Sequence, residues 1–394
     1  MNTSTSLSPN SVRKVKWVNL IFFSVTTLSA LIGCPWYLSQ YALTAADLAL
    51  FFFFFAATGM GITAGYHRLF AHTTYKANAF IRFLFLFFGA AAFEQSALMW
   101  SSQHRDHHRY VDTDLDPYSI KKGFWYAHMG WLVFWQHKTH YENSLDLQKD
   151  PLVVNQHRFY GLWAVTAGIV TPVAIGALFG HALAAFLFAV CLRLTVVYHA
   201  TFCINSVCHM FGKATYDVKA SAKDHWVVAL VTFGEGYHNF HHKFPVDYRN
   251  GVRWFHWDPS KWLIRSLALL GAAWDLKRTS KFRILEARLA GENLSARHSL
   301  LSAEAAAFVS KALDQLALQH ERVKMTLIRW EDAVRHYREL VRGQKMTESE
   351  DIKIAAIQKT KDARRIFNET YERWNRLIQN RPAELSEVLL RAAA

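Results

Sequence analysis

Four stretches of the sequence are long and apolar enough to cross a lipid bilayer. About twenty consecutive apolar residues span the hydrocarbon core as a helix. The first stretch has no charged residue, the second contains five consecutive phenylalanines, and the fourth is interrupted by Arg193. We therefore predict an all-α integral membrane protein with four transmembrane helices, at residues 17–38, 48–66, 159–179 and 182–204.

A fifth apolar run, residues 79–100, does not fit this simple count. It is long enough to span, but it carries Arg82, Glu94 and Gln95. A crossing here would put His67 and His104 on opposite sides of the membrane. We interpret the run as a re-entrant segment or a helix against the membrane surface, which is tolerated where protein buries the backbone. A fifth span is the alternative.

The distribution of basic residues predicts the orientation of the helices. Arg13, Lys14 and Lys16 precede the first span, whereas the links 39–47 and 180–181 contain no Lys or Arg. By the positive-inside rule, residues 1–16 are a cytoplasmic segment of a multi-pass protein of the inner, or cytoplasmic, membrane. The net charge of +14 is then explained by an anionic membrane surface, and we expect no nucleic-acid partner.

Polar, aromatic and basic residues dominate 109–158 and 210–296, which we expect to form a helical cap on the cytoplasmic side. Within this region, 261–277 alternates apolar and basic residues at helical spacing, as in a helix lying along lipid headgroups. We divide the chain into the N-terminal segment 1–16, a membrane domain with its cap at 17–300, and a C-terminal extension at 301–394.

The C-terminal extension has the spacing of a coiled coil. Its apolar seam, in which His320 fills one position, consists of Leu313, Leu316, Val323, Leu327, Trp330, Val334, Tyr337 and Val341. Gly343 ends this helix, Thr347 and Glu350 form a capping box for a second one, and Pro382 follows the second. The extension is a helical hairpin or a homodimerisation arm. A solvated helix folded back on the cap is the alternative.

Nine of the twenty histidines are grouped at spacings that suit metal binding. HxxHH places three imidazoles on one helical face, and the motif occurs twice. Imidazole is a common ligand of transition metals, but spacing alone does not choose between iron, zinc and copper. Nine nitrogens suit two adjacent metals, with a water held by Asn205, one turn before His209. The nine are His67, His72, His104, His107, His108, His209, His238, His241 and His242.

Several carboxylates lie close to these histidines in sequence. A ligating histidine usually donates its second ring N–H to a carboxylate, which fixes the tautomer. The candidates for this role are Asp106, Asp112, Asp114, Asp116 and Glu235. The four cysteines match no disulfide framework, and we expect free thiols.

The three boxes HRLFAH, HRDHH and HNFHH, in this order, resemble the membrane fatty-acyl desaturases, specifically the stearoyl-CoA desaturase family. The sequences around them extend the resemblance over roughly 17–290: Asp116-Pro117, His128-Met129-Gly130-Trp131, Gly234-Glu235-Gly236-Tyr237-His238 and Phe244-Pro245-Val246-Asp247-Tyr248-Arg249. The extension beyond residue 300 lies outside it.

This resemblance implies four spanning helices under a cytoplasmic cap that holds a di-iron centre. The nine histidines would be its ligands, with Asn205 acting through water. The reaction would insert a cis double bond, at delta-9, into a saturated acyl chain with O2 and two electrons. Family residues that bend the substrate tunnel are matched by Gln95, Trp100 and Thr201. No His-Pro-Gly-Gly motif of a fused cytochrome b5 domain occurs, so we expect a separate donor: a ferredoxin, a cytochrome b5-like protein or a flavoprotein.

The chain departs from the animal members of that family where they contact CoA. Ser102-Gln103 replaces an Arg-Asp pair and Trp135-Gln136 replaces an Arg-Lys pair. Loss of charged contacts to phosphates lowers affinity, although Lys121, Lys122 and Lys138 remain nearby. The acyl carrier is therefore CoA or membrane phospholipid, with a slight preference for the lipid.

Two other functions are compatible with the sequence. A related three-box hydroxylase or monooxygenase would also use iron and O2 but would insert oxygen. A non-enzymatic metal-binding or metal-transport membrane protein is the alternative from another class. A transporter should carry ionisable residues at the centre of the membrane, whereas these histidines lie at the ends of the predicted spans.

Overall fold

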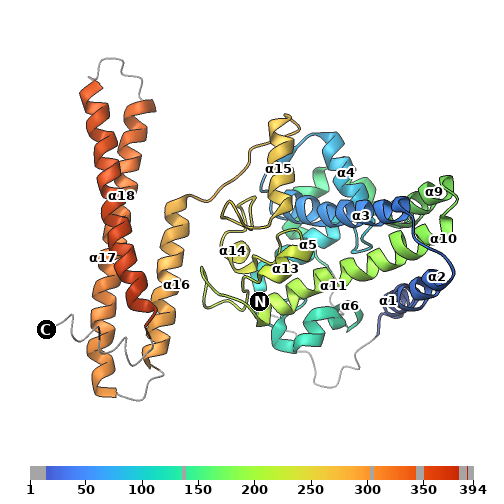
Figure 1. Cartoon of the computed structure of the whole chain (residues 1–394), viewed down its shortest axis with the longest axis horizontal. Coiled ribbons are helices and arrows are strands. Elements are labelled where there is room, and N and C mark those ends of the chain that lie inside the picture. The colour runs from blue at the N-terminus through green and yellow to red at the C-terminus, as the bar shows by residue number, and fades with distance from the viewer. Residues whose placement is uncertain (1–14, 135–138, 302–305, 343–349, 381–387, 389–394) are drawn as a thin grey trace, which may run out of the picture. The chain divides into compact units, whose positions relative to one another are not determined.

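The structure is a computed structural model that describes residues 15–134, 139–301, 306–342, 350–380 and 388. It divides into two compact units. The first comprises residues up to Lys213 and Ala220–Arg278, and contains the membrane spans and the histidines. The second comprises Ala214–Lys219 and residues from Thr279 onward. Figure 1 shows the elements of both units.

The four expected spans are confirmed. Four continuous helical segments, at Trp17–Gln40, Ala45–Ala71, Tyr160–Leu178 and Ala182–Met210, are long and apolar enough to cross a membrane. The second and fourth spans extend past their expected ends at residues 66 and 204, and so include His67 and His209. Each span contains a π-helical stretch, a rare feature that is often found at functional sites.

The spans are built from short elements in series. The first is α1 (Trp17–Leu28), η1 (Ser29–Gly33) and α2 (Cys34–Gln40); the second is α3 (Ala45–Met60) and η2 (Gly61–Ala71). The third is α8 (Tyr160–Val165), η7 (Thr166–Val170) and α9 (Thr171–Leu178). The fourth is α10 (Ala182–Ala184), η8 (Ala185–Leu192), α11 (Arg193–Asn205) and α12 (Val207–Met210).

The two links without basic residues meet, as a common side of the membrane requires. Thr44 forms the N-cap of α3 in a capping box with Asp47. Asp47 Oδ1 also lies 3.0 Å from Nδ1 of His181, which belongs to the link between the third and fourth spans. The opposite ends of the second and fourth spans carry the histidines.

The apolar run 79–100 is not a single helix. It consists of α4 (Ala79–Ala90) and the first turn of α5 (Ala97–Tyr110), separated by a break in which Phe93 and Gln95 adopt positive φ angles of 57° and 78°. At ~1.5 Å per residue, α4 is about 18 Å long, well short of a hydrocarbon core of about 30 Å. The expectation that this run is not a fifth span therefore holds.

A fully buried arginine joins three spans to this break. Arg193 donates from Nη1 to Thr58 Oγ1 (3.0 Å) and to the carbonyl of Ala91 (2.8 Å), and from Nη2 to the carbonyl of Gly168 (2.9 Å). Its Nε donates to the carbonyl of Ala189 one turn earlier. Unpaired charge is costly inside a membrane, and here every nitrogen of the guanidinium has an acceptor.

The remaining elements of the first unit form the cap around the histidines. Its helices are η3 (Ile120–Lys122), η4 (Tyr126–Gly130), α6 (Trp131–Phe134), η5 (Glu142–Ser144), η6 (Leu147–Lys149), α7 (Pro151–Arg158), α13 (Trp226–Val231), α14 (His238–Lys243) and α15 (Pro259–Leu269). Strand β1 (Lys76–Ala77) pairs antiparallel with β2 (Ala273–Trp274).

The prediction that 261–277 forms one helix is wrong. Helix α15 ends at Leu269 and the chain then enters β2. Lys261 is buried, and its Nζ donates to the carbonyls of Gly251, Arg253 and His256 at 2.7, 2.8 and 3.0 Å. The ammonium therefore fixes the preceding loop, a role that the alternation of apolar and basic residues does not reveal.

The second unit contains three helices, α16 (Lys281–Leu301), α17 (Ala306–Arg342) and α18 (Glu350–Ile378). The expected seam residues Leu316, Val323, Leu327 and Trp330 are buried, together with Phe282, Leu289 and Leu300 of α16 and with Phe367 and Trp374 of α18. Val341 of the seam is 51% exposed. Gly343, Thr347 and Pro382 lie outside the described residues.

The compact C-terminal unit begins at Thr279, earlier than the boundary expected at residue 300. The assignment of 210–296 as a whole to the cap is thus wrong for its last part. Helix α16 shares its core with α17 and α18 because its apolar face lies against them. Its weak amphipathic pattern gave no indication of this partner.

Candidate metal centre and acyl-chain cavity

Four helical elements, η2, α5, α12 and α14, position the nine grouped histidines. His67 lies in η2 and His72 immediately follows it; His209 lies in α12. On α5 and α14, the HxxHH spacing sets three imidazoles on one face of each helix. Although these segments lie far apart in the sequence, the structure brings all nine residues together.

The nine side chains form two groups, in each of which one ring nitrogen per residue lies within 4.8 Å of the others. The first group contains His67, His72, His104, His108 and His241, and the second contains His107, His209, His238 and His242. In the first group, His241 Nε2 lies 3.0 Å from His67 Nε2 and 2.8 Å from His108 Nε2. In the second, His238 Nε2 lies 3.0 Å from the Nε2 atoms of both His209 and His242.

These separations suit shared metal ligation. Two imidazole nitrogens bound at ~2.1 Å to one metal ion, at right angles, are about 3 Å apart. Burial lowers the pKa of His104, His108 and His241, and the neighbouring imidazoles lower it further. The rings are therefore neutral at physiological pH, and their Nε2 lone pairs are available to a cation.

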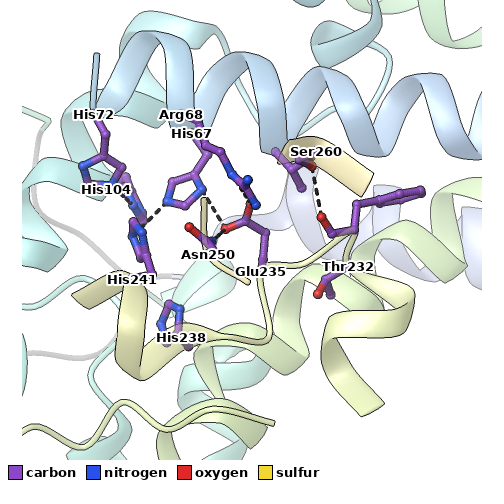
Figure 2. A network of polar contacts seen from close by, with 12 residues as sticks. His67, Arg68, His72, His104, Thr232, Glu235, His238, His241, Asn250 and Ser260 are labelled. Carbon is purple, nitrogen blue, oxygen red and sulfur yellow. Dashed lines mark hydrogen bonds and ion pairs between the residues drawn. The ribbon is translucent and has the colours of Figure 1, made fainter. Parts of the chain in front are cut away.

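A buried network of charges fixes His67 from behind, as Figure 2 shows. Glu235 Oε2 lies 2.7 Å from His67 Nδ1 and also accepts from Asn250 Nδ2 at 2.6 Å. Arg68 donates to Glu235 Oε1 and lies 2.9 Å from Asp258 Oδ1. Burial raises the pKa of Glu235, but His67 and Arg68 outweigh it and hold the pKa below its usual value. Glu235 is thus an anion that sets the orientation and tautomer of His67.

Other ligands have comparable partners on their Nδ1 atoms. Asp116 Oδ1 lies 2.8 Å from His107 Nδ1, and Tyr118 Oη lies 3.2 Å from His104 Nδ1. Ser221 Oγ lies 2.6 Å from Nδ1 of His209.

Of the five predicted carboxylates, Asp116 and Glu235 contact ligands directly. Asp112 acts one step away, because its Oδ2 accepts from the backbone N–H of Ser221. Asp106 instead accepts from Asn143 Nδ2 at 2.8 Å, and Asp114 offers its backbone carbonyl to Lys122.

An apolar cavity of about 400 Å³ adjoins the histidines. Its wall includes His67, His104, His238 and Asn205, and otherwise consists mainly of aromatic and aliphatic side chains from the first, second and fourth spans. Val18, at the start of the first span, lines the cavity and is 81% exposed, so the cavity reaches the surface at this end. A mostly apolar space beside a candidate metal centre suits a hydrocarbon chain.

Gln95, Trp100 and Thr201 all line this cavity, but a neighbouring residue organises it. Glu94 accepts from Trp100 Nε1 at 3.2 Å and from Thr201 Oγ1 at 3.0 Å. The Trp100 ring in turn stacks on His104, with 4.9 Å between ring centroids. The backbone N–H of Gln95, by contrast, donates to Tyr160 Oη.

Comparison with known proteins is consistent with this geometry. The family model "Fatty acid desaturase" matches residues 46–274. The chain belongs to the fatty acid desaturase family. Among its desaturase relatives are a probable acyl-CoA desaturase of Schizosaccharomyces pombe, 47% identical over 57% of this chain and 47% of the relative, and acyl-CoA desaturase 1 of Saccharomyces cerevisiae, 39% identical over 71% and 55%. Stearoyl-CoA desaturase 5 of Bos taurus is 34% identical over 70% and 83%.

The similarity covers only part of this chain and only part of each relative. The chain spans about half the length of the two fungal relatives. Conversely, helices α17 and α18 lie beyond the residues matched by the fatty acid desaturase family model. The spans, the three histidine boxes and the cavity all fall within or beside the matched region.

Sequence reasoning missed Glu94 as a cavity residue. The sequence did contain an indication of this role, because a carboxylate within an apolar run needs a polar partner. Burial raises the pKa of Glu94 to about 7, although its bonds to Thr201 and Trp100 oppose the rise. The positive φ angles of Phe93 and Gln95, which set Glu94 in place, were not visible in the sequence.

Proposed function

We propose that this protein is an O2-dependent fatty-acyl desaturase that inserts a cis double bond, at delta-9, into a saturated acyl chain. The observation that carries the proposal is the junction of two groups of largely buried imidazoles with an apolar cavity. The balanced reaction converts one –CH2–CH2– unit, O2, two electrons and two protons into –CH=CH– and two molecules of water.

In this proposal, the nine histidines would hold two iron ions, one at each of the two groups, with Asn205 acting through water. When bound, the iron supplies the oxidising power that unactivated methylenes require. His67 is kept in its metal-binding tautomer by Glu235, and His107 by Asp116. Neutral imidazoles leave the positive charge of the metals uncompensated, so the centre stays electrophilic.

The cavity residues place the chain. The wall excludes water from the reacting methylenes and restricts the chain to few conformations. Trp100 and Thr201, joined through Glu94, line the cavity, and the Trp100 ring stacks on His104. A chain that must pass this point presents a defined pair of carbons to the metals, which sets the position of the double bond.

For the acyl carrier, the names of the relatives support CoA. Ser102 and Gln103 support phospholipid as a second candidate, because neither carries a charge and both are tied to the 139–143 loop: Ser102 Oγ donates to the His140 carbonyl and Gln103 Nε2 donates to Thr139 Oγ1. Lys121 and Lys122 lie exposed on η3 and could meet a phosphate of either carrier. Trp135, Gln136 and Lys138 lie outside the described residues.

The electrons would come from a separate ferredoxin, cytochrome b5-like protein or flavoprotein, and the active site would face the cytoplasm. The basic cluster before the first span supports this orientation. A homodimer formed through the C-terminal helices remains a second part of the proposal. The buried seam of α17 argues that such a contact would use another face of these helices.

The proposal is tested with purified enzyme, loaded with iron and supplied with a reductase and an electron donor. Stearoyl-CoA and saturated phosphatidylcholine vesicles are offered separately, and products are analysed by mass spectrometry after derivatisation of the double bond. A delta-9 cis alkene from either carrier supports desaturation and identifies the carrier. A hydroxylated product would assign the protein to the monooxygenases. No product in any assay, together with metal flux into proteoliposomes, would favour transport.

A further inference from the structure

The cavity wall contains one buried hydrogen-bond donor that the proposed mechanism leaves unused. Trp131 lines the cavity, and its Nε1 is buried without a hydrogen-bond partner among the described residues. A buried indole N–H normally finds an acceptor. Because Trp131 lines a ligand cavity, a bound ligand would supply the missing acceptor.

Other polar groups of the wall are engaged by protein. Gln103 donates to Thr139, Asn19 to the carbonyl of Leu132, and Thr63 pairs with Ser260. Glu94 accepts from two donors, as described above. Among the described residues that line the cavity, and besides the histidines, the other buried side-chain atoms without a partner are Gln95 Oε1 and Tyr198 Oη.

These three atoms differ in whether they can donate a hydrogen bond to the substrate. The carbonyl oxygen of an acyl ester or thioester only accepts hydrogen bonds, and an indole N–H only donates. The amide oxygen Gln95 Oε1 is also an acceptor and cannot pair with a carbonyl oxygen. Tyr198 Oη can donate, but on α11 it lies on the far side of Thr201 from Asn205 and His209, and thus deeper in the span.

Trp131 lies at the mouth of the cavity. It begins α6, which is tied to the start of the first span: Asn19 Nδ2 donates to the Leu132 carbonyl, and the Lys16 N–H donates to the Val133 carbonyl. Val18, beside these residues, both lines the cavity and is largely exposed. The polar end of an acyl chain would lie here, at the boundary between hydrocarbon and headgroups.

We propose that Trp131 Nε1 donates a hydrogen bond to the acyl carbonyl of the bound substrate and so fixes the end from which the double bond is counted. This inference rests on the proposed function. Trp131 packs against Tyr118, with ring centroids 4.9 Å apart, and Tyr118 contacts His104. Tyr118 therefore connects the carbonyl anchor to a residue of the metal centre.

The test compares two chains that differ only in the carbonyl: methyl octadecanoate and methyl octadecyl ether. Their binding is measured by competition with a fluorescent fatty-acid probe, in wild type and in Trp131→Phe. We expect wild type to prefer the ester by about two- to tenfold, the usual worth of one neutral hydrogen bond, and Trp131→Phe to lose this preference. A structural role alone would weaken both ligands equally.

Trp125→Phe is the matched control, since Trp125 is 73% exposed and lines no part of this cavity. It should keep the ester preference. If wild type shows no ester preference, the inference is wrong whether or not the variant folds. If Tyr198→Phe loses the preference instead, the carbonyl lies at the deep end and the inference is also wrong.

Turnover distinguishes this inference from the proposed function. With an active wild type, Trp131→Phe should lower kcat/KM by about two- to tenfold and spread the double bond to neighbouring carbons. Unchanged products from Trp131→Phe would refute the anchor and leave desaturation intact. If wild type prefers the ester but converts no acyl substrate, the proposed desaturase function is refuted, whereas the role of Trp131 in binding the carbonyl is still supported.

Discussion

Glu94 should control where the double bond is placed. Its two carboxylate oxygens accept hydrogen bonds from Trp100 and Thr201, which both line the cavity. Replacement by Ala removes both bonds and leaves two partly buried donors without this acceptor. At about 0.5–1.5 kcal/mol per bond, the loss is roughly 1–3 kcal/mol. If this energy separates the correct position of the chain from a neighbouring one, the ratio of products falls by about 5- to 150-fold.

Glu94→Gln provides a matched control of the same shape. Its amide oxygen can accept from Trp100 Nε1, and its NH2 group can donate to Thr201 Oγ1, whose hydroxyl can also accept. The product distribution should therefore stay close to that of wild type. The assay is mass spectrometry of derivatised products from stearoyl-CoA or lipid. Similar products from wild type and Glu94→Ala would show that Glu94 does not hold the bend.

The same pair of variants predicts a pH effect. Because burial raises the pKa of Glu94 to about 7, the carboxylate that accepts both bonds is present above that pH and is lost as the pH falls through it. Bonds to an ionised acceptor are the stronger ones. Wild type should be more regioselective at about pH 8 than at about pH 6, whereas Glu94→Gln should not change. Equal pH dependence in both proteins would contradict this assignment.

Four further predictions concern the metal centre and the architecture. His108→Ala should lose at least one of about two bound irons per chain and all turnover, whereas the exposed His336→Ala should keep both, by elemental analysis. Asp116→Asn should weaken iron binding by about 10- to 100-fold, measured by chelator competition, because His107 loses its anionic partner. Truncation after Arg278 should leave the iron content unchanged; loss of iron would show that the C-terminal unit is required for the fold of the first. Lys261→Met should make the 251–257 loop sensitive to limited proteolysis while the spans stay protected, and an unchanged digestion pattern would contradict the role of its ammonium.

The spans and the histidine ligands were predictable because their signals are local. Length and hydropathy define a span, and HxxHH defines a helical face, without knowledge of the rest of the chain. Glu94 and Lys261 depend on contacts with segments far away in the sequence: Glu94 meets Thr201, and Lys261 meets the carbonyls of a loop. Such roles follow from tertiary packing. The same reason explains why α16, with no strong pattern of its own, was assigned to the wrong unit.

Arg193 has a consequence for biogenesis. An isolated fourth helix would bring an arginine into the bilayer at a cost of about 2.5–3.5 kcal/mol, before the acceptors of its two Nη atoms are in reach. These acceptors belong to the second span, the third span and the α4–α5 break, which are all synthesised earlier. The fourth helix is therefore inserted most favourably next to these segments once they are in the membrane. Arg193 thus makes stable insertion of the fourth helix depend on the earlier insertion of the second and third spans.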